Sequence, residues 1–169
     1  MTAQRQERYD RRPGIAFFAA LAALFVQAGQ PFAAWAAATT EQVVVSRFSG
    51  VAIEGFDPVA YFADARAEIG REEFEASAAG AVWRFRNEGN RASFVAHPDI
   101  YGPQFGGYDP TDVARGVTVA GNPRFWLISG QRLYLFGREA TRDAFAADTA
   151  RLLRNASLRW PDLKQSLSQ

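Results

Sequence analysis

The chain has 169 residues, of which 48% are hydrophobic and 14% aromatic, with one His and no Cys. This composition suits one globular domain and excludes a disordered chain, disulfides, zinc ribbons and a cysteine nucleophile. The net charge of +1 argues against a surface built to bind the nucleic acid backbone, so we expect no nucleic-acid partner.

The first 38 residues have the organisation of a bacterial secretory signal peptide. A segment with four Arg is followed by an uncharged apolar run at 14–26 and a small-residue tract at 33–38. The pair Arg11-Arg12 also fits the twin-arginine route, and an uncleaved anchor is the alternative to cleavage. We expect cleavage near Ala38 and a periplasmic or secreted domain at 39–169, which meets the membrane only through the signal segment during export. Loss of the segment leaves 15 basic and 16 acidic residues.

The first part of this domain contains one clear helix start. Val43, Val44 and Val45 are β-branched and predict a short strand or an extended lead-in. Asp57 precedes Pro58, and this order predicts a helix N-terminus with Asp as the cap and Pro at the first helical position. The charged residues 65–73 predict a surface loop.

Two β-hairpins and two helices are expected to follow. One hairpin spans 73–78 and 81–86, and a second spans 125–129 and 132–136, each around a Gly-containing turn. Asn90 is predicted to cap a helix that ends at His97-Pro98. Residues 100–109 are rich in Gly and aromatics and predict a loop, and 138–155 predict one long helix. The tail with Leu158, Trp160, Pro161 and Leu163 is expected to pack on the core.

An internal repeat relates the two hairpins. A shift of 51 residues aligns Val82-Trp83-x-Phe85 with Leu133-Tyr134-x-Phe136, and the same shift aligns Arg91 with Arg142 and Phe94 with Phe145. The repeat indicates either two similar units or the chance recurrence of a common motif. The predicted fold is α+β, a single domain of two β-hairpin-plus-helix units around a shared aromatic core.

Residues 50–62, which read GVAIEGFDPVAYF, resemble the opening of exported bacterial YHS-domain proteins. The rest of that pattern is matched by Trp83-Arg84-Phe85, by Asn90-Arg91-Ala92-Ser93-Phe94 and by the segment Tyr101-x-Pro103-Gln104-Phe105-Gly106-Gly107-Tyr108. The resemblance covers about residues 43–163. It implies a domain type that is often linked with heavy-metal binding.

One position departs from the family. There the Gly-Gly-Tyr is typically followed by Cys, whereas this chain has Asp109. A thiolate suits copper or zinc, and a carboxylate suits harder cations. We therefore expect the family's metal site to be altered. His97, Asp109 and Asp112 are the weak metal candidates, with the alternatives that Asp109 and Asp112 are turn or cap residues and that His97 ends a helix.

The candidate ligand-binding residues are aromatic, acidic and basic side chains that could line a small-molecule pocket. An ordinary core, helix caps and surface ion pairs are the structural alternatives. The candidates are Asp57, Tyr61, Trp83, Arg91, Tyr101, Tyr108 and Asp109.

These observations favour a non-enzymatic binding or accessory module for a small molecule, a cation or a protein. No nucleotide-binding or hydrolase motif is present, and we expect no cofactor. A low-turnover enzyme using Glu54, Asp57 and Asp109 is one alternative. A purely structural or interaction role is the other.

Overall fold

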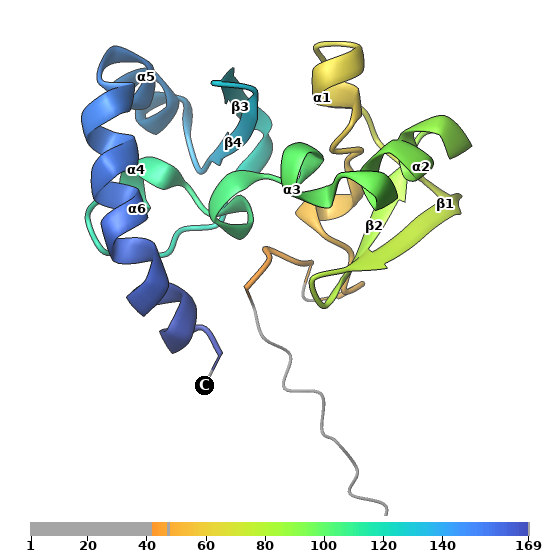
Figure 1. The fold of residues 1–169 in the computed structure, drawn as a ribbon, viewed down its shortest axis with the longest axis horizontal. Helices are drawn as coiled ribbons and strands as arrows, with labels where there is room; N and C mark the ends of the chain where they lie inside the picture. The colour runs from red at the N-terminus through yellow and green to blue at the C-terminus, as the bar shows by residue number, and fades with distance from the viewer. Residues whose placement is uncertain (1–41, 47, 169) are drawn as a thin grey trace, which may run out of the picture. The chain divides into compact units, whose positions relative to one another are not determined.

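The computed structural model describes residues 42–46 and 48–168 (Figure 1), so the predicted signal peptide and its cleavage position lie outside the described residues. The fold is α+β, with two small antiparallel hairpin sheets and aromatic clusters, as predicted. Within the described ranges, no helix has the length and apolar character needed to cross a membrane. The elements in chain order are η1 (Ile53–Gly55), α1 (Ala60–Ala63), β1 (Arg71–Ala78), β2 (Ala81–Phe85), α2 (Glu88–Ala96), α3 (Pro98–Tyr101), η2 (Gln104–Gly107), α4 (Pro110–Val113), β3 (Asn122–Ser129), β4 (Arg132–Phe136), α5 (Glu139–Ala147) and α6 (Thr149–Ser166).

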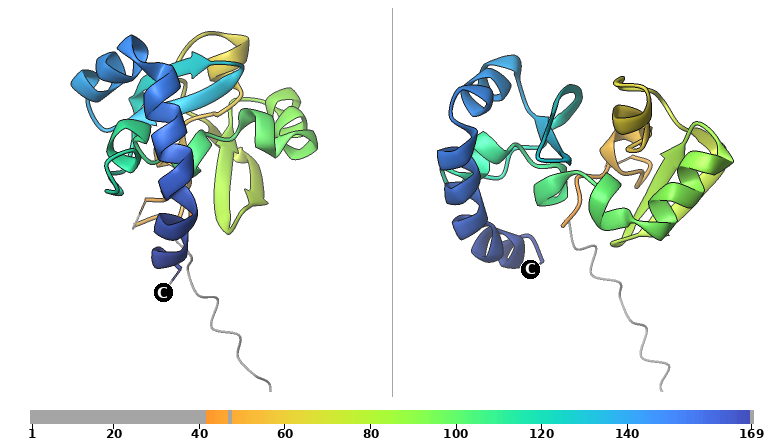
Figure 2. Two further views of the ribbon diagram at one scale, coloured as in Figure 1. Left: turned by 60° about the vertical axis from the view of Figure 1, so that its left-hand side comes forward. Right: turned by 45° about the horizontal axis from the view of Figure 1, so that its top comes forward.

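The sequence repeat is also a structural repeat. Each hairpin is followed by a nine-residue helix, and α2 contacts the first hairpin as α5 contacts the second (Figure 2). Both hairpins carry a register irregularity at the same place. The flanking pairs are Arg71↔Phe85 and Glu75↔Arg84 in one hairpin, and Asn122↔Phe136 and Trp126↔Leu135 in the other. Every one of these positions is related by the shift of 51. We name residues 51–96 the first unit and residues 103–147 the second unit.

A glycine at the start of each hairpin allows a close backbone approach. The Gly70 amide donates to the Gly55 carbonyl at 2.8 Å, and the Gly121 amide donates to the Gly107 carbonyl at 2.9 Å. A Cβ at Gly70 would lie 2.4 Å from the carbonyl carbon of Arg84, and one at Gly121 would lie 2.6 Å from the Gly107 oxygen. No side chain fits at either position, so both units require glycine there.

The strand β4 joins the cores of the two units. Successive side chains of a strand point to opposite faces. Leu133 and Leu135 accordingly belong to the aromatic cluster of the first unit, which includes Phe85 and Phe94. Tyr134 and Phe136 belong instead to a second cluster with Phe145, Leu152 and Ala156. Because β4 is buried on both faces, the two units share their core through this strand.

Tyr61 makes a second connection between the units. Its hydroxyl donates to the main-chain carbonyl of Pro123 at 2.9 Å, and its ring centroid lies 5.3 Å from that of Trp126 in an edge-on contact. Burial raises the pKa of the Tyr61 hydroxyl well above its ordinary range, and the Asp57 charge adds to this effect. The hydroxyl is therefore a neutral donor in the folded protein.

Several local predictions were wrong, and capping explains two of them. Residues 138–155 form parts of two helices, because the Asp148 carboxylate caps the Arg151 amide and starts α6. Asn87, and not Asn90, caps α2. The segment 100–109 contains parts of the short helices α3 and η2, and β1 begins within the predicted loop 65–73. Leu158 is 73% exposed, whereas Trp160 and Leu163 pack on the second cluster as expected.

The glycine requirement can be tested in both units. We expect Gly70→Ala and Gly121→Ala each to lower the free energy of unfolding by about 2–3 kcal/mol, because the new methyl group overlaps backbone atoms. Gly130→Ala is the control for backbone strain alone, because no atom lies within 4 Å of its Cβ position and the only cost is that of an alanine at a φ of 56°, about 1 kcal/mol. Urea unfolding followed by circular dichroism measures all three. A smaller loss of unfolding free energy from Gly70→Ala and Gly121→Ala than from Gly130→Ala would contradict the requirement for glycine.

The Tyr61 contact predicts an alkaline pH dependence. Because the folded-state pKa is raised, the unfolded chain ionises first, so this contribution is complete below about pH 10 and falls above it. Tyr61→Phe should cost about 1–2 kcal/mol near neutral pH through the lost hydrogen bond. It should also make stability fall less steeply above about pH 10 than in the parent protein. The prediction is refuted if the free energy of unfolding, measured by urea denaturation, falls equally steeply with pH in both proteins above about pH 10.

Candidate functional site

Asp57 is a buried cap that binds three parts of the first unit together. Its Oδ1 accepts hydrogen bonds from the amides of Val59 at 2.8 Å and Ala60 at 3.3 Å, at the start of α1. Its Oδ2 accepts from the Arg86 amide at 2.9 Å and from Nδ2 of Asn90 at 2.6 Å. The carboxylate accepts these amides as a helix cap would, but α1 begins at Ala60 with Val59 as its N-cap, so Pro58 precedes the helix and is not its first residue as predicted. Asn90 lies within α2 and donates to this carboxylate.

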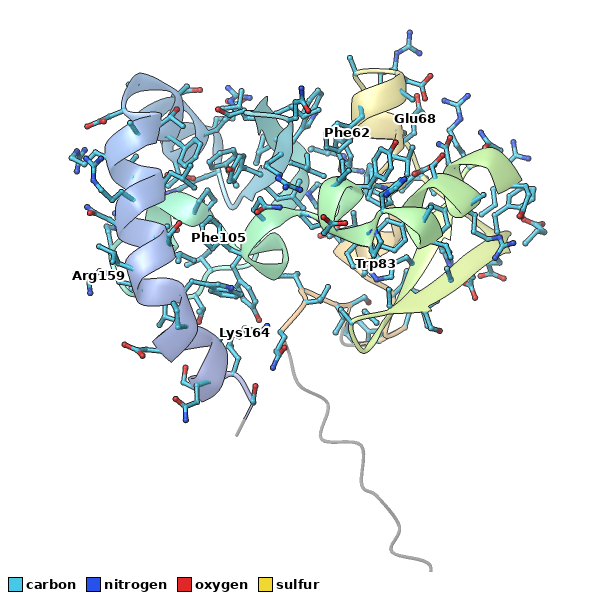
Figure 3. All side chains as sticks on the ribbon, in the orientation of Figure 1. Phe62, Glu68, Trp83, Phe105, Arg159 and Lys164 are labelled. Atoms are coloured by element: carbon cyan, nitrogen blue, oxygen red, sulfur yellow. The ribbon has the colours of Figure 1, made fainter. Side chains whose placement is uncertain are left out.

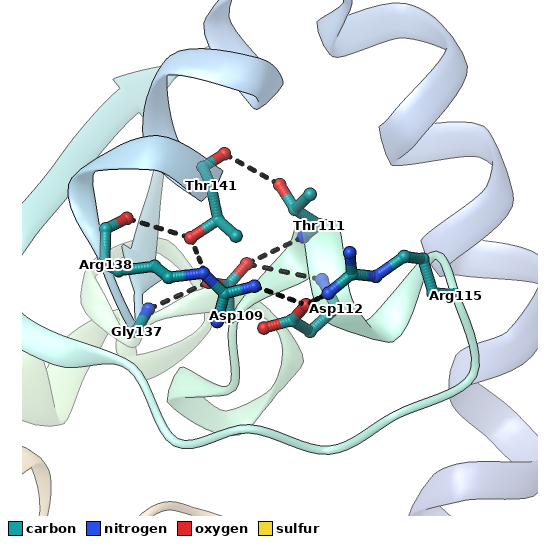
Figure 4. Close-up of polar contacts among 7 residues, drawn as sticks. All are labelled: Asp109, Thr111, Asp112, Arg115, Gly137, Arg138 and Thr141. Atoms are coloured by element: carbon teal, nitrogen blue, oxygen red, sulfur yellow. Dashed lines mark hydrogen bonds and ion pairs between the residues drawn. The ribbon is translucent and has the colours of Figure 1, made fainter.

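Asp109 has the same environment in the second unit (Figure 4). Its Oδ1 accepts from the amides of Thr111 at 2.9 Å and Asp112 at 3.4 Å. Its Oδ2 accepts from the Gly137 amide at 2.8 Å and from the Thr141 hydroxyl. Like Asp57, Asp109 is fully buried. Each carboxylate thus has both oxygens occupied by donors of its own unit.

A heavy metal does not fit at Asp109, where the family resemblance implies a thiolate. A metal ligand needs a free lone pair directed at the ion, whereas the Asp109 oxygens already accept four hydrogen bonds. His97 is exposed at the junction of α2 and α3. Among residues 42–46 and 48–168, no three His, Asp or Glu side chains converge in an arrangement that could hold a metal ion.

Asp112, the third acidic candidate, contacts two arginines. Its carboxylate is fully buried, and Oδ1 accepts from Nη2 of Arg115 and, at 3.3 Å, from Nη2 of Arg138 (Figure 4). Its Oδ2 is buried without a hydrogen-bond partner among the described residues. The alternative that Asp109 and Asp112 lie at a helix start is therefore confirmed, whereas the contact with the two arginines was not predicted.

An apolar cavity of about 320 Å³ lies beside the segment that connects the two units. Trp83 of β2 and Phe105 of η2, both labelled in Figure 3, contribute to its wall together with Phe94 of α2. Asp99 and Gln104 are its polar side chains. The remaining lining residues are Val43, Ala78, Ala79, Pro98, Gly102, Pro103 and Gly106.

Of the seven candidate ligand-binding residues, only Trp83 lines this cavity. Tyr61 lies in the core, and the rings of Tyr101 and Tyr108 pack against Phe62 and Trp160. Arg91 pairs with Glu88 one helical turn away. Glu54, the third carboxylate of the enzyme alternative, is exposed.

The structure therefore brings together a different set of residues from the one singled out by sequence. The cavity combines Val43, the turn of the first hairpin, the end of α2 and residues 102–106, which are distant along the chain. A usable sequence signal was the family-like pattern at Pro103-Gln104-Phe105-Gly106, since all four of these residues line the cavity.

The cap role predicts a matched loss of stability in the two units. Asp57→Ala and Asp109→Ala should each lower the free energy of unfolding by about 3–5 kcal/mol, because buried amide donors lose a charged acceptor. Asp143→Ala, which removes an exposed partner of Arg142, should change it by about 0.5 kcal/mol or less. Urea denaturation measures the three values. Near-parent stability of Asp109→Ala would show that its carboxylate is not needed for folding.

Comparison with protein-family models, with curated proteins and with solved structures found no match to this chain.

Proposed function

We propose that the chain is a non-enzymatic, exported binding module of YHS type, whose ligand is a small and largely apolar molecule. The observation that carries the proposal is the cavity beside residues 102–106. Its volume of about 320 Å³ is that of a small ligand pocket, and its walls combine aromatic side chains with a few polar groups. A compound of one or two rings, with a polar group facing Asp99 or Gln104, suits such a wall.

The state of the buried carboxylates supports binding over carboxylate-dependent catalysis. A general acid or base must reach the proton that it transfers within hydrogen-bond distance. Asp57 and Asp109 are fully buried and are committed to caps, and neither lines the cavity. Two of the three carboxylates on which the enzyme alternative depends, Asp57 and Asp109, are therefore not placed to transfer a proton to a ligand in the cavity.

The family part of the proposal depends on the residue pattern. The segment that resembles YHS proteins at 101–108 contributes Gly102, Pro103, Gln104, Phe105 and Gly106 to the cavity wall. Phe105 has a φ of 53°, in the left-handed region that non-glycine residues rarely adopt, and such conformations occur often at ligand sites. The pattern and the cavity therefore coincide at residues 102–106. Asp109, which stands in place of the family's Cys, is the altered metal position and does not line the cavity.

Binding can be measured with the uncharged fluorescent probe N-phenyl-1-naphthylamine. We expect saturable binding to the domain at 39–169, and Ala78→Leu should weaken it at least about tenfold by filling the cavity, which corresponds to about 1.4 kcal/mol. Ser77→Leu is the matched control, because Ser77, which precedes Ala78 in β1, is exposed and does not line the cavity. Equal affinity in all three proteins, or no saturable binding to the parent, would favour the interaction role.

The altered metal site needs its own measurement. Protein purified after export is analysed by native mass spectrometry and by elemental analysis. We expect no stoichiometric copper or zinc, because the Asp109 oxygens are occupied by hydrogen bonds. One bound copper or zinc per chain would overturn this part of the proposal and leave the cavity measurement unaffected.

A further inference from the structure

Two arginines of the second unit share one buried carboxylate. Asp112 is 0% exposed, whereas the side chains of Arg115 and Arg138 are 58% and 50% exposed. The two guanidinium groups thus meet at the Asp112 Oδ1 atom (Figure 4), while about half of each arginine side chain is exposed. The backbone origins of the three residues differ, since Arg115 follows α4 and Arg138 directly precedes α5.

This arrangement has more positive charge and more donors than the carboxylate can satisfy. Two guanidinium groups and one carboxylate leave a net charge of +1. Each guanidinium carries five N–H donors in a planar fork. Within the part of the chain that the structure describes, neither side chain has an acceptor other than Asp112 Oδ1. The unused forks suit a tetrahedral oxyanion, whose several oxygens can accept from both arginines.

The first unit shows that the fold does not need these three residues. Counted from the capping aspartates, the positions of Asp112 and Arg115 correspond to Ala60 and Ala63. Counted from the hairpins, Arg138 corresponds to Asn87. The first unit nevertheless forms the same cap, register and helix. The trio is therefore an addition to one copy of a repeated scaffold.

Stability is a poor explanation for this addition. Removing a carboxylate from water carries a desolvation cost that an ion pair often only balances. Arginine side chains that are half exposed contribute little through such a pair. The net effect on folding is then small, whereas a pair of arginines held side by side is well suited to bind a ligand.

We propose that Arg115 and Arg138 bind a phosphate group and that Asp112 is the positioning residue that holds their guanidinium groups together. The site uses none of the residues that line the cavity, so it is independent of the proposed function. The phosphate group is that of a soluble phosphate compound or of a lipid headgroup, which present the same oxygens.

Calorimetric titration of the domain at 39–169 with inorganic phosphate, at constant ionic strength in chloride buffer, tests the site. Saturable binding is expected, and Arg115→Gln and Arg138→Gln should each weaken it at least about tenfold. Arg142→Gln is the matched control, because this arginine of α5 pairs with Asp143 and Glu139. Absent saturable binding, or equal weakening by the control, would overturn the proposal.

A triple variant distinguishes loss of phosphate binding from loss of folding. The triple substitution Asp112→Ala, Arg115→Ala and Arg138→Asn copies the first unit, so it should unfold in chloride at a temperature close to that of the parent. Its unfolding temperature should not rise in phosphate, whereas that of the parent should. An equal rise in both proteins would assign phosphate to another place and sink the proposal.

The positioning role of Asp112 has a distinct signature. Asp112→Asn retains an oxygen acceptor and removes a negative charge, so phosphate affinity should rise. Asp112→Ala changes the charge equally but frees both arginines, so affinity should fall. Equal gains from both substitutions would show that Asp112 acts only through its charge.

Vesicles distinguish the two sources of the phosphate group. Retention on phosphatidic acid vesicles, but not on phosphatidylcholine vesicles, would support the lipid headgroup if Arg115→Gln abolishes it. Binding of free phosphate without such retention would support a soluble compound. Failure of both probes would refute the site, even where the cavity binds its own probe.

Discussion

A buried aspartate determines the structure of each unit. One carboxylate oxygen receives the amides that begin a short helix, and the other receives the amide directly after a hairpin strand and a side chain of the next helix. A fully buried carboxylate is tolerated only where donors satisfy it, so the three segments must meet around it. In each unit the start of a short helix, the end of the second strand and the following helix are thereby held at one point.

The repeat separates scaffold from site. What the units share, including the cap, the irregular hairpin and the following helix, is what the fold requires. Residues that occur in only one unit are available for function, and the two arginines beside Asp112 are residues of this kind. The cavity belongs to neither unit alone, since Trp83 and Phe94 come from the first unit and Phe105 from the second. It therefore exists only when both units are folded together.

Local features were predictable from sequence, and non-local ones were not. The hairpins and the capping role of Asp57 depend on turn and cap chemistry within a few residues, and the repeat of 51 residues supported the hairpins. The division of 138–155 at Asp148 was missed, because apolar spacing continues across the break and only the cap reveals it. The cavity was missed because Val43, Trp83 and Phe105 approach one another only in three dimensions. The two arginines had one signal, namely that Arg138 replaces an asparagine of the other copy.

The two-sided burial of β4 has a consequence for how the chain folds as it is made. Leu133 and Leu135 complete the aromatic cluster of the first unit, although they follow it by about 40 residues along the chain. Contacts of such sequence separation slow folding, because the intervening loop must close first. During synthesis the first unit therefore remains open, with apolar surface uncovered, until the second hairpin has emerged. A chaperone that holds an incomplete chain would meet its client in that interval.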